Sequence, residues 1–255
     1  MDCYAKMHGR SMKFSDRERC IGMNSPGHSD NRLAQGEHTR QQILKAAGQM
    51  FAQKGYGRTS IRDISAASGV GLSNIIYHFQ SKENLFLATI RHFTVELGAL
   101  NQHFAPLFDV DPQDKQAVAD TLHTSIHSFL NACHGPESVK NLLGLYLRIL
   151  VEGNDKALTM LFECFADVQK ALPEFFKRVC PDMDDMQAAF MQQLLWSLLQ
   201  YPVVSKRLIL YDMKLEDDFT PEYLAAAAWH IAMYVCLPLG LPAPSQSVLE
   251  VTEAE

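Results

Sequence analysis

The sequence predicts an all-α fold in which a small N-terminal three-helix domain precedes a larger helical domain. From residue 39 onward apolar residues recur with the period of an α-helix that buries one face. Glycine and proline interrupt this period at intervals of helix length, and no β-strand alternation competes with it. Residues 38–91 carry a net charge of +5, whereas residues 92–255 carry −12. A basic module on an acidic body is typical of a polyanion binder with a second domain, although chance distribution of surface charge gives the same division.

The composition indicates a globular protein with a substantial core. Of 255 residues, 47% are hydrophobic and 20% are charged, which excludes collagen-like and disordered classes. A bilayer span needs about 20 apolar residues, and the most apolar stretch, 223–241, is interrupted by His230, Pro238 and Gly240. The first 36 residues lack the basic-then-apolar order of a secretion signal. The sequence therefore predicts a cytoplasmic protein with no membrane partner.

The cysteines and histidines do not predict a metal site. The six cysteines are scattered without a Cys-x-x-Cys spacing, so free thiols are expected. His123 and His127 are four residues apart on one expected helix, and Cys133 and His134 follow, but no spacing fixes a third ligand. We expect neither a metal nor a cofactor.

The first expected helix begins at Thr39 and stops at Gly55. Residues 1–36 are rich in glycine, serine, asparagine and charge, and are expected to form a disordered tail. Thr39 and Gln42 match a capping box, and glycine commonly follows the last turn of a helix. The apolar face of this helix consists of Ile43, Ala47, Met50 and Phe51.

Two short helices and a long one are expected next. Ser60 and Asp63 repeat the capping box before a helix that ends at Gly69. A tight turn leads into a third helix over about 72–79, and a fourth helix is expected to run from Ser81 toward residue 104.

The rest of the chain predicts about six further helices. They are expected near 114–133, 137–151, 155–179, 183–200, 202–214 and 220–237. The chain thus divides into a tail (1–36), a three-helix domain (37–97), a second helical domain (98–243) and a flexible C-terminus (244–255).

The second and third expected helices form a helix-turn-helix, whose second helix presents its N-terminal residues to the DNA major groove. Ile75 and Phe79, four residues apart, are expected to pack inward. Asparagine can pair with an adenine edge through both ends of its amide, and serine can bind a base or a phosphate. The outward-facing side chains, which we expect to contact DNA, are Ser73, Asn74, Tyr77 and His78.

Basic side chains flank this unit. Lys82 lies in the first turn of the fourth helix, where free N–H groups and the positive helix end favour a phosphate. Arg40, Arg58 and Arg62 are expected to flank the same groove. Each of them alone is most simply a solvated surface charge, but together with the turn and the caps they favour a DNA-binding face.

A resemblance to a known family covers about residues 37–97. The stretches "RQQILKAAGQMFAQKGYGRTS" and "TSIRDISAASGVGLSNIIYHFQSKENL" look like the N-terminal DNA-binding region of the TetR/AcrR family of bacterial repressors. The Gly-Tyr-Gly turn, the Thr-Ser-Ile-Arg-Asp-Ile helix start and the Tyr-His-Phe-x-Ser-Lys-Glu-x-Leu segment occur in the family's order and spacing.

The resemblance implies a homodimer whose two helix-turn-helix units occupy successive major grooves of a palindromic operator in double-stranded DNA. It also implies a C-terminal domain that holds the dimer interface and a pocket for a small-molecule effector, which we expect to be hydrophobic and to release a repressor from DNA. By position, the family's DNA contacts fall on Thr59, Leu72, Ser73, Asn74, Tyr77, His78 and Lys82.

Three positions depart from the family's pattern. Gly71 stands where a capping serine or threonine is usual, Leu72 where a lysine or arginine is common, and Ile76 where an aromatic residue is frequent. A flexible glycine weakens a helix start, and a lost cation removes a phosphate contact. These departures predict weaker operator binding or a shifted set of contacts.

Two apolar segments, 183–200 and 221–237, suit a dimer face, and the resemblance places the family's interface on the last two long helices. Small residues let helices approach closely, and large apolar ones bury area. Packing within one chain is the alternative for each residue. The expected interface residues are Met191, Leu195, Trp196, Leu199, Ala225, Ala228 and Trp229.

A ligand pocket is expected among apolar and aromatic residues of the middle helices, although plain core explains the same spacing. Arg148 is a charge in an otherwise apolar helix, so it needs a partner, either Glu152 one turn on or an anionic ligand group. The expected pocket residues are Phe129, Tyr146, Leu147, Arg148, Leu150, Phe162 and Phe165.

Effector binding is expected to act through the fourth helix, which spans both domains. Its movement would change the separation of the two DNA-binding units from the ~34–36 Å of one DNA turn. A helical adaptor with lost or weak DNA binding is an alternative that the departures keep open. An enzyme is less favoured, because the chain lacks a GxSxG, HExxH, P-loop or dinucleotide motif.

Overall fold

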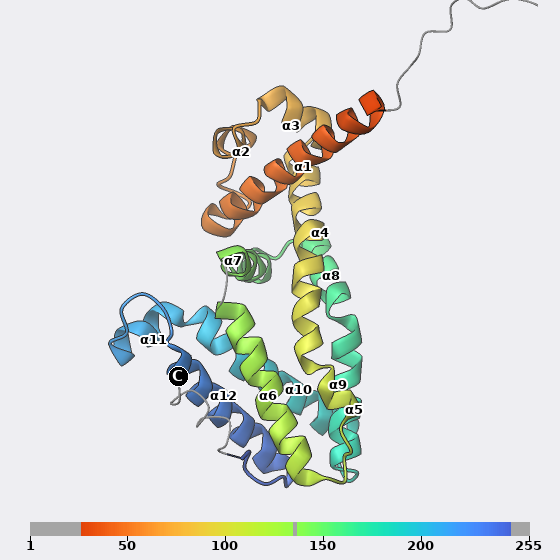
Figure 1. Ribbon diagram of the computed structural model, residues 1–255, viewed down its shortest axis with the longest axis vertical. Coiled ribbons are helices and arrows are strands. Elements are labelled where there is room, and N and C mark those ends of the chain that lie inside the picture. The colour runs from red at the N-terminus through yellow and green to blue at the C-terminus, as the bar shows by residue number, and fades with distance from the viewer. Residues whose placement is uncertain (1–26, 135–136, 246–255) are drawn as a thin grey trace, which may run out of the picture. The chain divides into compact units, whose positions relative to one another are not determined.

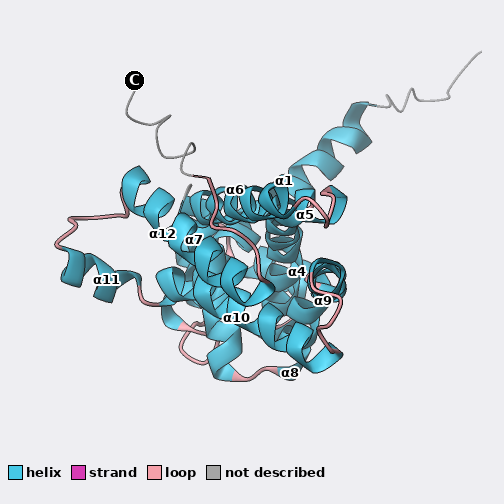
Figure 2. Ribbon diagram, turned by 90° about the horizontal axis from the view of Figure 1, so that it is seen from below, coloured by secondary structure: helices cyan, strands magenta, loops and turns pink. Residues whose placement is uncertain are grey.

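The computed structural model describes residues 27–134 and 137–245. The chain divides into two compact units, residues 1–38 and 39–255, and the second contains all helices from α2 onward. Every regular element in the described ranges is helical, with no strand among them (Figures 1 and 2). The prediction of an all-α fold is confirmed.

The helices follow one another with short connections. In chain order they are α1 Gly27–Lys54, α2 Ile61–Ser68, α3 Leu72–Phe79, α4 Lys82–Leu100, the 3-10 helix η1 Asn101–Phe104, α5 Pro106–Asp109, α6 Lys115–His134, α7 Glu137–Glu152, α8 Asp155–Cys164, α9 Ala166–Val179, α10 Asp185–Val204, α11 Lys206–Met213, α12 Pro221–Cys236 and the 3-10 helix η2 Leu237–Leu239.

Caps define the ends of the short helices near the N-terminus. The predicted capping box is present at α2, because Ser60 Oγ accepts from the Asp63 amide and the Asp63 carboxylate accepts from the Ser60 amide. Gly69 ends α2 with φ at +69°, a left-handed conformation that suits glycine. Ser81 Oγ accepts from the Asn84 amide and caps α4. The ends predicted at these three residues are confirmed.

α1 begins earlier than expected. It starts at Gly27, so Thr39 lies within the helix and the predicted cap at Thr39 and Gln42 is wrong. Residues 27–36, expected in the tail, are helical, and the rest of that tail, residues 1–26, lies outside the described residues. Between Pro26 and Gly55 the sequence holds no proline, so nothing forces the helix to begin at Thr39.

The part of the chain from α4 onward, called the body below, is built from helix pairs. α6 packs along α12, α9 along α10, and α4 along α8. The helix expected over 155–179 is two helices that meet at Phe165, and the expected break at Pro202 is absent because α10 continues to Val204. α4 leads from α3 into the body and gives way to η1 after Leu100, so the fourth helix is shorter than expected (Figure 1).

The segment Pro221–Leu239 is long and apolar enough to cross a membrane by length and composition alone. This differs from the expectation that His230 and Pro238 exclude such a stretch. In the structure, 44% of the segment is buried inside the fold. Its buried side chains include Leu224, Ala228 and Val235. The packing of α12 against α6 therefore accounts for the apolar side chains on its buried face.

His123 is a buried titratable group on α6. It is 1% exposed, and neither ring nitrogen has a hydrogen-bond partner among the described residues. Burial lowers the pKa of His123 from its ordinary value of 6.5, and the neighbouring His127 lowers this pKa further, against an opposing effect of Asp120. The imidazole is therefore held neutral in the folded chain.

Acid is expected to destabilise the protein through His123. The folded pKa lies below the unfolded value, so the stabilisation is present above about pH 6.5 and is lost as the pH falls toward the folded pKa, because the unfolded chain then binds more protons. His123→Leu should flatten the dependence of the free energy of unfolding on pH between 7 and 5, measured by urea unfolding. The control is His230→Leu, at an exposed position of α12. An unchanged slope in His123→Leu would contradict the expectation.

Candidate nucleic-acid interface and ligand cavity

The third helix separates its apolar and polar residues by face. Ile75 and Phe79 are 1% and 4% exposed and pack with the buried Val70. Their spacing of four residues places them on one side of α3, as predicted. The other side chains of the helix are exposed, except for the half-buried His78; those on the predicted DNA face are Leu72, Ser73, Asn74 and Tyr77.

The basic residues near α3 differ in their surroundings. Arg62 is exposed on α2. The Lys82 ammonium lies 4.3 Å from the centre of the Tyr56 ring, at the first residue of α4. The Arg40 guanidinium carbon lies 5.6 Å from the centre of the Phe79 ring. These cation–π contacts hold Lys82 and Arg40 beside the ends of α3 and α4.

Thr59 does not fit its predicted place among the DNA contacts. It is 1% exposed, and its hydroxyl lies 2.8 Å from the Gly55 carbonyl oxygen and 3.2 Å from that of Met50, to which it donates. The side chain thus ties the turn after α1 to the end of that helix. In the sequence, Thr59 precedes the capping residue Ser60, and this position does not indicate that the threonine is buried.

Thr59→Val is expected to lower the free energy of unfolding by about 1–3 kcal/mol, because it leaves a buried carbonyl without its donor. The affinity of the folded protein for DNA should stay the same. Chemical unfolding and fluorescence anisotropy with labelled DNA measure the two quantities separately. If Thr59→Val loses DNA affinity without losing stability, Thr59 contacts DNA as the sequence predicted.

Gly71 leaves the start of α3 without a side-chain cap. No side-chain hydrogen bond is made at this N-cap position, as expected for a glycine. Its φ is −58°, and the nearest atom that an added Cβ would meet is Ser73 Oγ at 4.0 Å. The backbone does not require glycine here, so the departure weakens the helix start without a compensating structural need.

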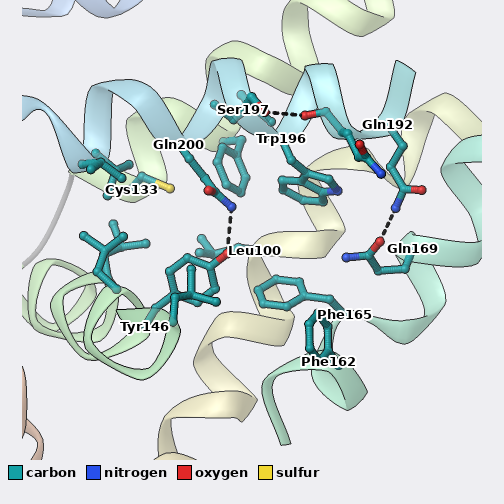
Figure 3. Close-up of a pocket in the computed structure, with 18 of the residues that line it drawn as sticks. Leu100, Cys133, Tyr146, Phe162, Phe165, Gln169, Gln192, Trp196, Ser197 and Gln200 are labelled. Atoms are coloured by element: carbon teal, nitrogen blue, oxygen red, sulfur yellow. Dashed lines mark hydrogen bonds between the residues drawn. The ribbon is translucent and has the colours of Figure 1, made fainter. Parts of the chain in front are cut away.

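A cavity of about 500 Å³ lies in the body (Figure 3). α7 and α10 supply most of the described wall, and Leu100 of α4, Phe129 and Cys133 of α6, Phe162 of α8 and Gln169 of α9 also line it. Six of the seven residues predicted for a ligand pocket line it, namely Phe129, Tyr146, Leu147, Leu150, Phe162 and Phe165. Their role in ligand binding stays a prediction.

The polar groups of the cavity come mainly from α10. Gln200 donates to the Tyr146 hydroxyl oxygen at 2.7 Å, and Gln192 donates to Gln169 (Figure 3). Trp196 lies between these two pairs in the view of Figure 3, and its buried Nε1–H has no acceptor among the described residues. These glutamines were not among the predicted pocket residues. Gln192 and Gln200 are polar residues within the apolar helix α10, and such a residue is the kind of signal that singled out Arg148.

Arg148 does not line the cavity. Its guanidinium donates to the Ala52 carbonyl oxygen at 3.4 Å and to that of Gln53 at 3.2 Å, in the last turn of α1. The last carbonyls of a helix lack partners within it and carry negative partial charge. This contact replaces both partners expected for Arg148, Glu152 and an anionic ligand.

Glu152 and Gly144 continue the contact between α7 and α1. The Glu152 carboxylate accepts from the Tyr56 amide at 3.0 Å. A Cβ added at Gly144 would lie 3.3 Å from the Ala52 Cβ, which shows a close approach of the two helices. With Arg148, these residues recur every four positions and share one face of α7. The cavity-lining residues of α7 occupy other positions: Leu143, Tyr146, Leu147 and Leu150.

Most of the residues predicted for a dimer interface are buried within the chain and so are not available on its surface. Met191, Leu195, Leu199, Ala225 and Ala228 are each at most 7% exposed. α10 is apolar around most of its circumference, so its sequence does not decide which face turns inward. Of the other two, Trp196 lines the cavity and Trp229 Nε1 donates to the Pro244 carbonyl oxygen at 3.3 Å.

The exposed faces of α10 and α12 carry other apolar side chains. Phe190 is 61% exposed and Tyr234 is 56% exposed. The exposed apolar residues on these two helices and η2 are Met186, Phe190, Leu194, Tyr201, Val204, Tyr234 and Leu237. We call this set the α10–α12 apolar surface.

The described residues hold no group of three or more potential metal ligands. The rings of His123 and His127 lie 6.3 Å apart. Burial raises the pKa of the Cys133 thiol to about 12, so this cavity residue is a neutral thiol rather than a thiolate.

Residues 43–89 match the family described as "Bacterial regulatory proteins, tetR family". RutR of Escherichia coli K12, a transcriptional regulator, is 38% identical over 69 residues, which are 26% of this chain and 32% of that protein. KstR2 of Rhodococcus jostii, a transcriptional repressor, is 26% identical over 117 residues, 46% of this chain and 54% of that one. The chain thus spans less than two thirds of these curated relatives.

Solved structures match a larger part of the fold. A TetR-like regulator from Rhodococcus sp. RHA1 matches with a TM-score of 0.57 at 16% identity, over 79% of this chain and 96% of that one. A regulator from Saccharomonospora viridis, crystallised with choline, matches with a TM-score of 0.54 at 17% identity, over 78% and 96%. At such identities the likeness concerns the fold alone. The helix-turn-helix region of the chain thus matches the TetR family, as the resemblance implied, and the larger part of the chain shares the fold of solved TetR-like regulators.

Proposed function

We propose that the protein is a cytoplasmic, ligand-responsive transcriptional repressor that binds a palindromic operator as a homodimer and is released by a small hydrophobic effector. The observation that carries the proposal is α3, which buries Ile75 and Phe79 and leaves Asn74 and Tyr77 exposed. The match to the TetR family supports regulation rather than catalysis, as the absence of enzyme motifs predicted. KstR2, a repressor by name, supports repression.

The charge distribution supports DNA as the partner. The basic residues of 38–91 stand against a strongly acidic remainder, so a polyanion is attracted to one part of the chain only. Lys82 begins α4, where backbone N–H groups also favour a phosphate. Base contacts would come from Ser73 and Asn74, and backbone contacts from Tyr77 and Lys82.

The α10–α12 apolar surface supports a homodimer. Monomeric proteins rarely expose large contiguous apolar patches, and such patches mark interfaces. α10 and α12 pack against each other, so their exposed side chains belong to neighbouring helices. We therefore move the proposed interface from the buried residues of these helices to this surface.

The cavity supports an effector-binding role, and α7 offers a route from the cavity to the DNA-binding part. One set of α7 residues lines the cavity, while Arg148 and Glu152 bond the end of α1 and the turn after it. α4 also takes part, through Leu100 in the cavity and Glu83 at its first turn, whose carboxylate lies 2.6 Å from Lys156 Nζ of α8. An effector that displaces α7 would shift α1 together with α3. This proposal adds α7 and α1 to the switch that the sequence predicted through the fourth helix alone.

Arg148→Met is expected to uncouple the two sites. Coupling between an effector and DNA typically changes affinity about 5–150-fold, and the variant should reduce this factor toward one while effector affinity stays unchanged. The measurement is DNA affinity by anisotropy with and without a compound found by thermal-shift screening of hydrophobic metabolites and drugs. The control is Arg178→Met, because Arg178 likewise donates to a carbonyl, that of Phe108, but within the body. Full coupling in Arg148→Met would disprove the α7 route.

The proposal as a whole is tested by gel shift against the DNA upstream of the protein's own gene at stated salt concentrations. A repressor should bind one site there as a dimer, with affinity that falls as salt rises. Absence of specific binding at low salt would favour the helical adaptor, which the uncapped α3 and Leu72 in place of a cation also favour.

A further inference from the structure

The described residues that line the cavity carry no charge near neutral pH, because no lysine, arginine, aspartate, glutamate or histidine is among them. The ionisable residues in this described set are Cys133 and Tyr146, and burial raises the pKa of each, to about 12 for the cysteine. A buried ligand charge would lose its hydration without gaining an opposite charge, which is costly.

The wall does contain hydrogen-bonding groups, and one of them is unpaired. Trp196 Nε1–H is buried and meets no acceptor among the described residues. Indole N–H groups donate only, so whatever satisfies this one must accept a hydrogen bond. In Figure 3 the nitrogen of the Trp196 ring lies on the side of the Gln192–Gln169 pair. The amides of this pair and of Gln193 add groups that both donate and accept.

The rest of the described wall is apolar and combines aliphatic side chains with several aromatic rings. Trp196 and Phe165 have ring centres 6.1 Å apart, and those of Phe165 and Tyr146 are 6.4 Å apart. Phe162 and Leu150 line the cavity while 63% and 41% exposed, so they stand at its entrance. The volume of about 500 Å³ is within the roughly 300–1,000 Å³ of ligand sites.

We propose that this cavity binds an uncharged, aromatic or otherwise apolar ligand with a carbonyl-type oxygen that accepts a hydrogen bond from Trp196 Nε1. The inference rests on the proposed function, because it names the chemical class of the effector. Aromatic rings also attract cations, and the fold neighbour from Saccharomonospora viridis was crystallised with choline. Among the described lining residues here there is no carboxylate to balance such a cation, whereas a polar neutral group finds both donors and acceptors.

Four probes of similar shape separate these possibilities: biphenyl-4-carboxamide, biphenyl-4-carboxylate, (biphenyl-4-ylmethyl)trimethylammonium and 4-methylbiphenyl. Binding to the full-length protein is measured by calorimetry. The carboxamide should bind at least tenfold more tightly than either charged probe, with an affinity that is constant from pH 6 to pH 9. Equal or tighter binding of a charged probe, or binding of none of the four, would overturn the proposal.

Trp196→Phe keeps an aromatic ring and removes the N–H group. It should weaken the carboxamide at least fivefold and change 4-methylbiphenyl by less than twofold. Trp229→Phe, the same replacement outside the cavity, is the matched control. Equal weakening of both probes by Trp196→Phe would show a packing effect only and would disprove the hydrogen bond.

Release from DNA is measured separately with the same probes. If the protein prefers the carboxamide but the carboxamide does not release it from DNA, the proposed ligand class would hold and the proposed effector response would be contradicted. If a charged compound bound in the cavity releases the protein from DNA, the proposed ligand class would be wrong and the proposed ligand-responsive repression would hold.

Discussion

Replacing Asn74 and Tyr77 together with alanine is expected to lower operator affinity at least 100-fold while leaving the fold intact. Each good base contact contributes about 1–3 kcal/mol of discrimination, and Tyr77 is proposed to add a contact with the DNA backbone. Both side chains are exposed, with Tyr77 at 79%, so their loss removes little packing. Anisotropy titrations with operator and with unrelated DNA, at one salt concentration, measure the specific part of the loss.

Tyr211→Ala is the matched control for this pair. Tyr211 is 83% exposed on α11, so it has the same chemistry as Tyr77 on an element outside the helix-turn-helix. It should leave operator affinity unchanged, and thermal unfolding should show all variants equally stable. If Asn74→Ala/Tyr77→Ala binds its operator like the parent protein, α3 is not the recognition helix.

Phe190→Glu combined with Tyr234→Glu is expected to convert the dimer into a monomer and to weaken operator binding by about 10²–10⁴-fold. The loss follows because linking two binding modules raises affinity by about that factor. A carboxylate at the α10–α12 apolar surface would be buried without a partner in the dimer. Light scattering coupled to gel filtration reports the mass, and gel shift reports the operator affinity.

Tyr211→Glu places the same charge on a different exposed apolar position and serves as the control. A dimer that survives Phe190→Glu/Tyr234→Glu but dissociates with Tyr211→Glu would move the interface to α11. A parent protein that is monomeric at every concentration tested would end the homodimer proposal itself.

Local signals predicted the first part of the fold well. The ends of α2 and the start of α4 follow from Ser60, Gly69 and Ser81, whose caps act within a few residues. The inward face of α3 follows from the spacing of Ile75 and Phe79. The start of α1 was mispredicted, because a capping sequence at Thr39 is also compatible with a helix interior.

The functional surfaces of the body were predicted less well, because they depend on which face of a helix meets which neighbour. Residues such as Leu195 and Phe190 both lie on α10 and are both apolar, yet one is buried and the other exposed. Six of the cavity residues were predicted from the sequence, because they are aromatic or apolar residues of the middle helices. The contact of Arg148 joins residues 95 or 96 positions apart in the chain, and no local pattern reports such a pairing.

α7 both lines the cavity and contacts the end of α1, and this has an evolutionary consequence. One of its faces lines the cavity, and the opposite positions hold the end of α1, so a substitution that shifts this helix is expected to alter the cavity and the contact with α1 at once. Adaptation to a new ligand is therefore expected to proceed first through α10, whose cavity residues can change while the contact of α7 with α1 stays intact.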